Sequence, residues 1–101
     1  MVQMPLNRLK EKIEKENLWL FVLSSLSKKK RYGNELRGIF KERFGFLTGT
    51  MTAYKVLYLL KIGGYVKSER EGKLIYYEIT GKGRKELING RKVLKKYSEI
   101  I

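Results

Sequence analysis

The hydrophobic pattern changes period at Gly63 and Gly64, and this change limits the possible folds more than any other feature of the chain. Before these glycines, apolar residues recur every three or four positions, which is typical of helices packed on a core. From Tyr65 to Ile79 the pattern changes to a period of two, with Val66, Ile75, Tyr77 and Ile79 on one face, which is typical of strands. The sequence therefore predicts a helical domain that carries one β-hairpin, with a final helix capped by Thr80.

We expect the hairpin to turn at Glu71 and Gly72, which pairs Val66 with Tyr77. The residues that this register turns toward the core are Val66, Ile75, Tyr77 and Ile79. Because an isolated hairpin is marginally stable, it must pack against the helices. The basic residues that it presents near its tip are Lys67, Arg70 and Lys73.

The first expected helix begins at Pro5, a residue that a first helical turn tolerates. Its apolar stripe consists of Leu6, Leu9 and Ile13, with charged residues between them. A stripe this narrow fits two arrangements equally well. The helix can lie on the core of its own domain, or it can pair with a helix of a second subunit.

The second expected helix, residues 18–27, is apolar on nearly every side and has Asn17 as its N-cap. A helix of this kind is buried on several faces, so we expect it at the centre of the domain. The four cations Lys28, Lys29, Lys30 and Arg31 follow it. Since like charges repel, the run predicts an exposed loop, either a solvated turn or a segment that contacts phosphate groups.

Two further helices surround an apolar turn that contains Gly45, as in a helix-turn-helix. The third helix opens at Tyr32 and Gly33, and the fourth begins with Thr48 or Thr50 as its N-cap. The inward positions of the fourth helix are Ala53, Val56, Leu57 and Leu60. The small or polar residues near its start that can reach base edges in a major groove are Thr48, Thr50, Thr52, Tyr54, Lys55 and Tyr58.

We expect one domain over residues 1–101, of the α+β class and mainly helical: a winged helix-turn-helix with added N- and C-terminal helices. Asn89 and Gly90 are a point at which the last helix can bend or break. The apolar residues of segments 1–16 and 88–101 from which an interface with a second subunit is inferred are Leu6, Leu9, Ile13, Val93, Leu94, Tyr97, Ile100 and Ile101.

The net charge of +13, from 23 basic and 10 acidic residues, points to a polyanionic partner. The chain has no cysteine and no histidine, which excludes disulfides, thiolate or imidazole catalysis and the usual zinc sites. We therefore expect neither an enzyme nor a cofactor or metal. The abundance of lysine and glutamate fits a thermophile. The longest apolar run, residues 18–23, is too short to span a bilayer, so we expect a cytoplasmic protein without a membrane partner.

Four segments of the chain resemble the PadR-like family of winged-helix transcriptional regulators. They open at Tyr32, Thr52, Gly64 and Tyr76, and the last, YYEITGKGR, is the most specific. The resemblance implies a homodimeric regulator of the repressor type whose terminal helices, in segments 1–16 and 88–101, form the dimer. The residues that we expect to contact double-stranded DNA, from the helix-turn-helix, the basic run before it and the wing, are Lys28, Lys29, Lys30, Arg31, Tyr32, Thr48, Thr50, Thr52, Tyr54, Lys55, Tyr58, Lys67, Arg70 and Lys73. The chain departs from the family pattern at residues 49–51, where a Ser-Pro-Gly turn is usual, and at Leu59 and Ile62, where charged residues are usual.

Alternatives of a different class stay open at this point. A winged helix can serve as a protein-interaction module through the apolar residues Leu59, Ile62 and Leu74. It can also bind nucleic acid without sequence preference, as an architectural or RNA-binding module. The segment after Leu87 leaves little room for an effector domain, and the sequence does not decide whether a small-molecule effector exists.

Overall fold

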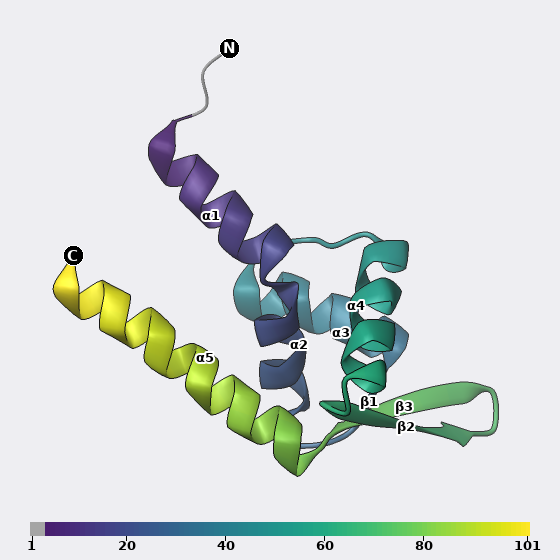
Figure 1. Cartoon of the computed structure of the whole chain (residues 1–101). Coiled ribbons are helices and arrows are strands. Elements are labelled where there is room, and N and C mark those ends of the chain that lie inside the picture. Colours follow the sequence, from purple (N-terminus) through teal and green to yellow (C-terminus); the bar gives the residue numbers. More distant parts are fainter. Residues whose placement is uncertain (1–3) are drawn as a thin grey trace.

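The computed structural model describes residues 4–101, so the first three residues of the expected N-terminal segment lie outside the described part. It confirms a mainly helical α+β winged helix with added terminal helices (Figure 1). The elements are α1 (Pro5–Glu16), α2 (Leu18–Leu26), β1 (Arg31–Tyr32), α3 (Gly33–Ile39), η1 (Phe40–Phe44), α4 (Thr50–Ile62), β2 (Val66–Glu71), β3 (Leu74–Ile79) and α5 (Gly81–Ile100). The segment η1 is π-helical and continues α3.

Helix α2 lies at the centre of the domain, as its apolar composition predicts. Its residues Leu18, Val22, Leu23 and Leu26 are at most 2% exposed. The buried residues that the other elements add to this core are Leu36, Phe40, Leu57, Leu60, Val66, Ile79 and Leu87. Asn17 is the N-cap residue of α2, as expected, but its side chain makes no capping hydrogen bond to that helix: it donates instead to the Lys12 carbonyl oxygen of α1 at 3.4 Å.

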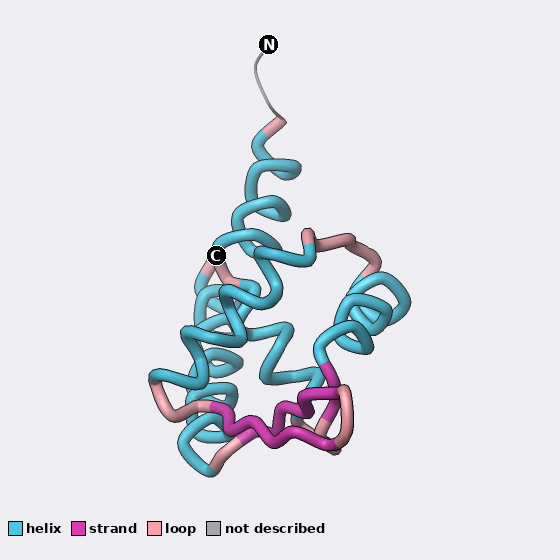
Figure 2. The backbone as a smooth tube through the Cα atoms, turned by 90° about the vertical axis from the view of Figure 1, so that its right-hand side faces the viewer, coloured by secondary structure: helices cyan, strands magenta, loops and turns pink. Residues whose placement is uncertain are grey.

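Strand β1 is an element that the sequence pattern did not predict. Its two residues pair with β3, which gives an antiparallel sheet in the order β1-β3-β2. A two-residue strand has no periodicity of its own and exists only because β3 supplies the hydrogen-bonding partner. Figure 2 shows this small sheet at one end of the molecule, with the helices above it.

The expected register of the hairpin was wrong by two residues. Val66 pairs with Ile79, not with Tyr77, and the turn consists of Gly72 and Lys73. Gly72 has a φ of 62°, as the first central position of a type II′ turn requires. A shift of two residues keeps each side chain on its predicted face, so Val66 and Ile79 are buried. Ile75 was wrongly placed in the core: it is 47% exposed because the hairpin extends past the helices.

Two predicted helix boundaries also differ from the structure. Gly49, in an extended conformation, is the N-cap of α4, so Thr50 is the first helical residue and Thr48 lies before the cap. Helix α5 runs without a break through Asn89 and Gly90. At Gly90 a Cβ atom would stand 2.5 Å from the Leu20 side chain, so the glycine permits close packing of α5 on α2.

The terminal helices α1 and α5 project from the body on the side away from the hairpin (Figure 1). Leu6 is 75% and Leu9 58% exposed, so these two residues of the α1 stripe do not lie on the core of their own domain. In the second half of α5, Val93, Leu94 and Tyr97 are each about half exposed. Both helices therefore carry apolar surface that this chain leaves open to solvent.

Candidate nucleic-acid interface

Helix α4 presents one exposed face on the side opposite to its buried residues Ala53 and Leu57. Met51, Lys55 and Tyr58 occupy this face at spacings of four and three, so they lie along one line of the helix. Met51 is 86% and Tyr58 62% exposed. A protruding helix with long, exposed side chains at its start has the shape that a major groove accepts.

Tyr54 packs against the start of α3 at Gly33. A Cβ atom on residue 33 would lie 2.5 Å from the Tyr54 hydroxyl oxygen, so the glycine makes space for the ring. Burial raises the pKa of the nearby Tyr77 phenol, with a smaller contribution from Tyr54. Tyr54 is 40% exposed, so it joins α3 and α4 while part of the residue remains accessible.

The three predicted threonines fall in different places. Thr50 is exposed in the first turn of α4. Thr48 and Thr52 line a cavity of about 350 Å³ between the start of α4 and the end of α1, together with Glu14 and Lys15. Lys55 does not line this cavity. The carbonyl oxygen of Thr48 accepts a hydrogen bond from Arg37 Nε at 3.3 Å, which fixes the loop before α4.

The hairpin, or wing, carries its basic residues at and near its tip. Lys73 lies in the turn and is exposed. Arg70 Nε donates to the Gly72 carbonyl oxygen at 3.1 Å, which holds this side chain beside the turn. Lys67 lies nearer the base of the wing, with its ammonium 3.6 Å from Glu78. The tip is thus more strongly cationic than the rest of the wing.

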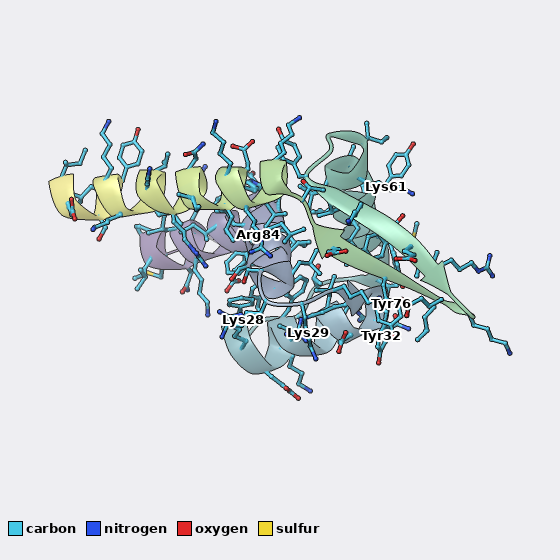
Figure 3. The ribbon with its side chains drawn as sticks, turned by 90° about the horizontal axis from the view of Figure 1, so that it is seen from below. Lys28, Lys29, Tyr32, Lys61, Tyr76 and Arg84 are labelled. Atoms are coloured by element: carbon cyan, nitrogen blue, oxygen red, sulfur yellow. The ribbon has the colours of Figure 1, made fainter. Side chains whose placement is uncertain are left out.

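The four successive cations after α2 are not equivalent in the structure. Lys28 and Lys29 are exposed and visible from below the molecule (Figure 3). Lys30 forms an ion pair with Glu71 of the wing, and its ammonium lies 5.2 Å from the centre of the Tyr76 ring. The hydrogen bond to Glu71 raises the pKa of Lys30 above its usual value. Lys30 therefore connects this loop to the wing.

Arg31 and Tyr32 are also held by internal contacts. Arg31 Nε donates to the Ser25 carbonyl oxygen at 2.8 Å, and the guanidinium lies 3.7 Å from Glu35. Tyr32 belongs to β1, and its ring meets Tyr76 edge to face at 5.8 Å (Figure 3). Both residues help to attach the sheet to α2 and α3.

The segment 80–83, part of the most specific family-like piece of the sequence, joins the wing to α5. The Thr80 hydroxyl donates to the Gly64 carbonyl oxygen at 2.7 Å and accepts from the Gly83 amide at 3.1 Å. Lys82 Nζ donates to the Gly63 carbonyl oxygen at 2.6 Å. These contacts satisfy the end of α4 and the start of α5 together, so the segment has a structural role at the base of the wing.

The structure adds two residues to the candidate nucleic-acid interface that were not selected from the sequence, Met51 and Arg84. Met51 was assigned to the outside of α4 but not to the site, although it lies four residues before Lys55. Arg84 donates through Nη1 to the Ser27 carbonyl oxygen at 2.8 Å, which places it beside Lys28 and Lys29 (Figure 3). The helical spacing signalled Met51, whereas the contact of Arg84 depends on the tertiary fold.

Within residues 4–101, no helix is both long enough and apolar enough to cross a membrane. In the same part of the chain, no three acidic side chains come together in a way that could hold a metal ion.

The family model described as "Transcriptional regulator PadR-like family" matches residues 22–89. The chain belongs to the PadR-like family. The match covers the winged helix from α2 to the first half of α5. No curated protein matches the chain.

Solved structures of PadR-like and related regulators share this fold. A transcriptional regulator from Clostridium thermocellum has a TM-score of 0.81 at 20% identity, over 88% of this chain and 93% of its own. A PadR family regulator from Clostridium difficile has a TM-score of 0.76 at 24% identity, over 82% and 92%. Bacillus subtilis PadR, solved in complex with operator DNA, has a TM-score of 0.62 at 24% identity, over 71% of this chain and 45% of its own.

Proposed function

We propose that this PadR-like protein is a cytoplasmic, homodimeric transcriptional regulator that binds specific sequences in double-stranded DNA and acts as a repressor. One observation carries the proposal: the exposed face of α4 at Met51, Lys55 and Tyr58 accompanies a wing with a cationic tip, in a chain of net charge +13. The operator complex of Bacillus subtilis PadR supports DNA as the partner.

In this proposal α4 enters the major groove and the wing contacts the adjacent backbone or minor groove. Lys55 reads a guanine edge or contacts a phosphate, and Met51 and Tyr58 contribute apolar contact to the bases. Thr50 and Tyr54 reach the groove from the start of the same helix. Arg70 and Lys73 supply phosphate contacts, which add affinity without sequence choice.

The loop after α2 has a divided role in the proposal. Lys28 and Lys29 contact phosphates that flank the groove, since both are exposed. Lys30, Arg31 and Tyr32 act on DNA binding through the position of the wing, because their side chains are engaged within the chain. Thr48 and Thr52, which face α1, and Lys67, beside Glu78, stay secondary candidates for DNA contact.

We assign dimerisation to α1 and α5. A groove of about 300 Å³ between them is lined by Ile13, Leu20, Val93 and Leu94, and a helix of a second subunit can fill it. The exposed apolar residues Leu6, Leu9, Tyr97, Ile100 and Ile101 extend this surface. A two-fold dimer presents two copies of α4 to two half-sites, and a dimer bound across an operator represses by excluding other proteins.

Selection of bound sequences from a random pool of duplex DNA tests the proposal directly. We expect a palindromic motif whose half-sites lie about 34–36 Å apart, or a multiple of one helical turn. The logarithm of the affinity should fall linearly with the logarithm of the salt concentration, because binding releases counterions. Binding without any preferred sequence would instead indicate an architectural protein, and preference for RNA or for a protein partner would replace the proposal.

A further inference from the structure

A cavity of about 550 Å³ lies between α2 and α4 and is also lined by residues of α1 and α5. It is next to the groove assigned to the dimer, and the two share Trp19 and Glu86. Its apolar wall consists of Leu18, Trp19, Val56, Leu59, Leu60 and Tyr65. This volume is within the range of pockets that hold small organic molecules, and such pockets are mainly apolar with few polar groups. Two aromatic side chains in the wall favour a ligand with an aromatic body.

The charged groups of this cavity leave a negative charge at its wall. Lys15 is bound to Glu11 at 2.6 Å, and Glu16 is bound to Lys12 at 2.8 Å, so each of these lining residues has a partner of opposite charge. Glu86 accepts a hydrogen bond from the neutral Tyr65 hydroxyl, a contact that raises the pKa of Tyr65. The Tyr65 hydroxyl orients the Glu86 carboxylate but does not neutralise it.

A cation is present near this wall but does not line the cavity. The Lys82 ammonium lies 4.6 Å from the centre of the Tyr65 ring and is bound to the Gly63 carbonyl oxygen. It is therefore held outside the cavity, beside the aromatic ring. Within the cavity Glu86 is the group that can select the charge of a ligand.

We propose that this cavity binds an organic cation with an apolar, aromatic body. The aromatic body would lie against Trp19, Leu59 and Tyr65, and the positive group would lie at Glu86. The match between the Glu86 carboxylate and a cationic ligand is a local feature of the cavity. The whole chain carries a net charge of +13 and attracts anions in general.

The cavity is connected to DNA binding through α4. Val56, Leu59 and Leu60 form one side of this helix, and Met51, Lys55 and Tyr58 form the side assigned to the groove. Trp19 and Glu86 also line the groove between α1 and α5, so a ligand would contact the dimer interface as well. A ligand in the cavity that favours one arrangement of α4 should therefore change the affinity of the protein for its operator. This regulatory role rests on the proposed function.

The fluorescence of Trp19, the one tryptophan of the chain, reports on occupancy of the cavity. We would titrate the full-length protein with tetraphenylphosphonium and, separately, with tetraphenylborate, which has nearly the same shape and the opposite charge. The proposal expects the cation to bind more tightly by about tenfold or more, against the net charge of the protein. Equal binding, or tighter binding of the borate, would overturn it.

Three variants test the place and the charge of the site. Leu59→Lys should abolish tetraphenylphosphonium binding, whereas Ile62→Lys, on the same helix but outside the cavity, should retain it. Both residues are more than half exposed, so both variants should fold, and circular dichroism checks this. Glu86→Gln should weaken binding of the cation by about tenfold and strengthen binding of the borate, because the carboxylate that attracts the cation repels the anion. Binding that survives Leu59→Lys would place the ligand elsewhere and overturn the assignment.

Operator binding measured in the same samples separates this inference from the proposed function. We expect tetraphenylphosphonium to change the affinity of the protein for operator DNA by about 5- to 150-fold. Operator DNA should change the affinity of the protein for tetraphenylphosphonium by the same factor. If no DNA sequence is preferred, the proposed function fails while the fluorescence titration still tests the cavity. If the cation binds but operator affinity is unchanged, the site stands and its regulatory role is wrong.

Discussion

The carbonyl oxygen of Tyr65 occupies the space in which a Cβ atom of residue 83 would stand, since that atom would lie only 2.1 Å from it. Gly83 thus lets the first turn of α5 approach the backbone at the base of the wing. The same carbonyl oxygen accepts the Thr80 amide at 3.1 Å. The backbone packing at this junction depends on the absence of a side chain at residue 83.

Gly83→Ala should therefore destabilise the fold. We expect a loss of about 2–3 kcal/mol in the free energy of unfolding, because the new methyl group meets backbone that cannot rotate away. Gly81→Ala, in the same helical turn, is the matched control: within the described chain an added Cβ there meets nothing within 4 Å. Chemical denaturation measures both variants, and equal stability of the two would contradict the packing argument.

The contact of Gly33 with Tyr54 predicts a variant that affects DNA binding. In Gly33→Ala the methyl group displaces the Tyr54 ring and with it the alignment of α3 and α4, so we expect weaker operator binding and a stability loss of about 1–3 kcal/mol. Gly38→Ala is the control on α3, since an added Cβ has open space there among the described residues. It should bind DNA normally and gain up to about 1 kcal/mol in stability.

Lys55 and Arg70 should differ in their effect on sequence choice. Lys55→Ala is expected to weaken binding to the selected operator by about tenfold or more and to affect random DNA less, because a base contact carries discrimination. Arg70→Ala should weaken both by similar factors and reduce the slope of log affinity against log salt by about one. Electrophoretic mobility shifts over a range of salt concentrations distinguish these outcomes, and similar behaviour of the two variants would contradict the assignment of α4 to the bases.

The ion pair between Lys30 and Glu71 places a carboxylate near the cationic tip of the wing. Glu71→Gln removes that negative charge and releases Lys30, so the affinity for DNA of any sequence should rise a few-fold at low salt and less at high salt. Glu42→Gln, on the exposed part of η1, removes the same charge elsewhere. If both variants bind DNA equally well, the position of the carboxylate beside the wing has no influence.

The proposed dimer predicts different outcomes at two similarly exposed positions of α5. Val93 is 52% and Ile88 49% exposed, but only Val93 lines the groove between α1 and α5. Val93→Lys should raise the dimer dissociation constant by about tenfold or more, because it introduces a charge in an apolar interface. Ile88→Lys should leave it unchanged. Sedimentation equilibrium measures both, and a dimer that tolerates Val93→Lys would place the interface elsewhere.

The sequence was sufficient for the main elements because their signals are local. The apolar composition of α2 on nearly every side, the periodic apolar positions of α4 and the period of two after Gly64 each reflect surface that must be buried. Strand β1 could not be predicted, since two residues become a strand only through pairing with β3. The register of the hairpin was wrong because Glu71 with Gly72, and Gly72 with Lys73, are both acceptable turns in sequence terms.

The candidate site was harder to predict in detail than the fold. A run of four cations reads as one basic loop, but the fold gives Lys30 and Arg31 internal partners and leaves Lys28 and Lys29 exposed. Thr52 and Lys55 are about one helical turn apart on α4, yet only Thr52 lines the cavity beside α1. Such differences depend on which neighbours surround each side chain, and these neighbours come from distant parts of the chain.

The junction of residues 63–65 with 80–83 has a consequence for how such regulators diversify. Contacts at the base of the hairpin hold its two ends together. The entropy lost on closing this loop depends only weakly on the number of residues between the two ends. The tip, at Arg70, Gly72 and Lys73, is exposed and makes no contribution to the buried core. Insertions and substitutions at the tip should accordingly change the stability of the fold little. Relatives can therefore acquire new operators through the tip while the contacts between residues 63–65 and 80–83 are retained.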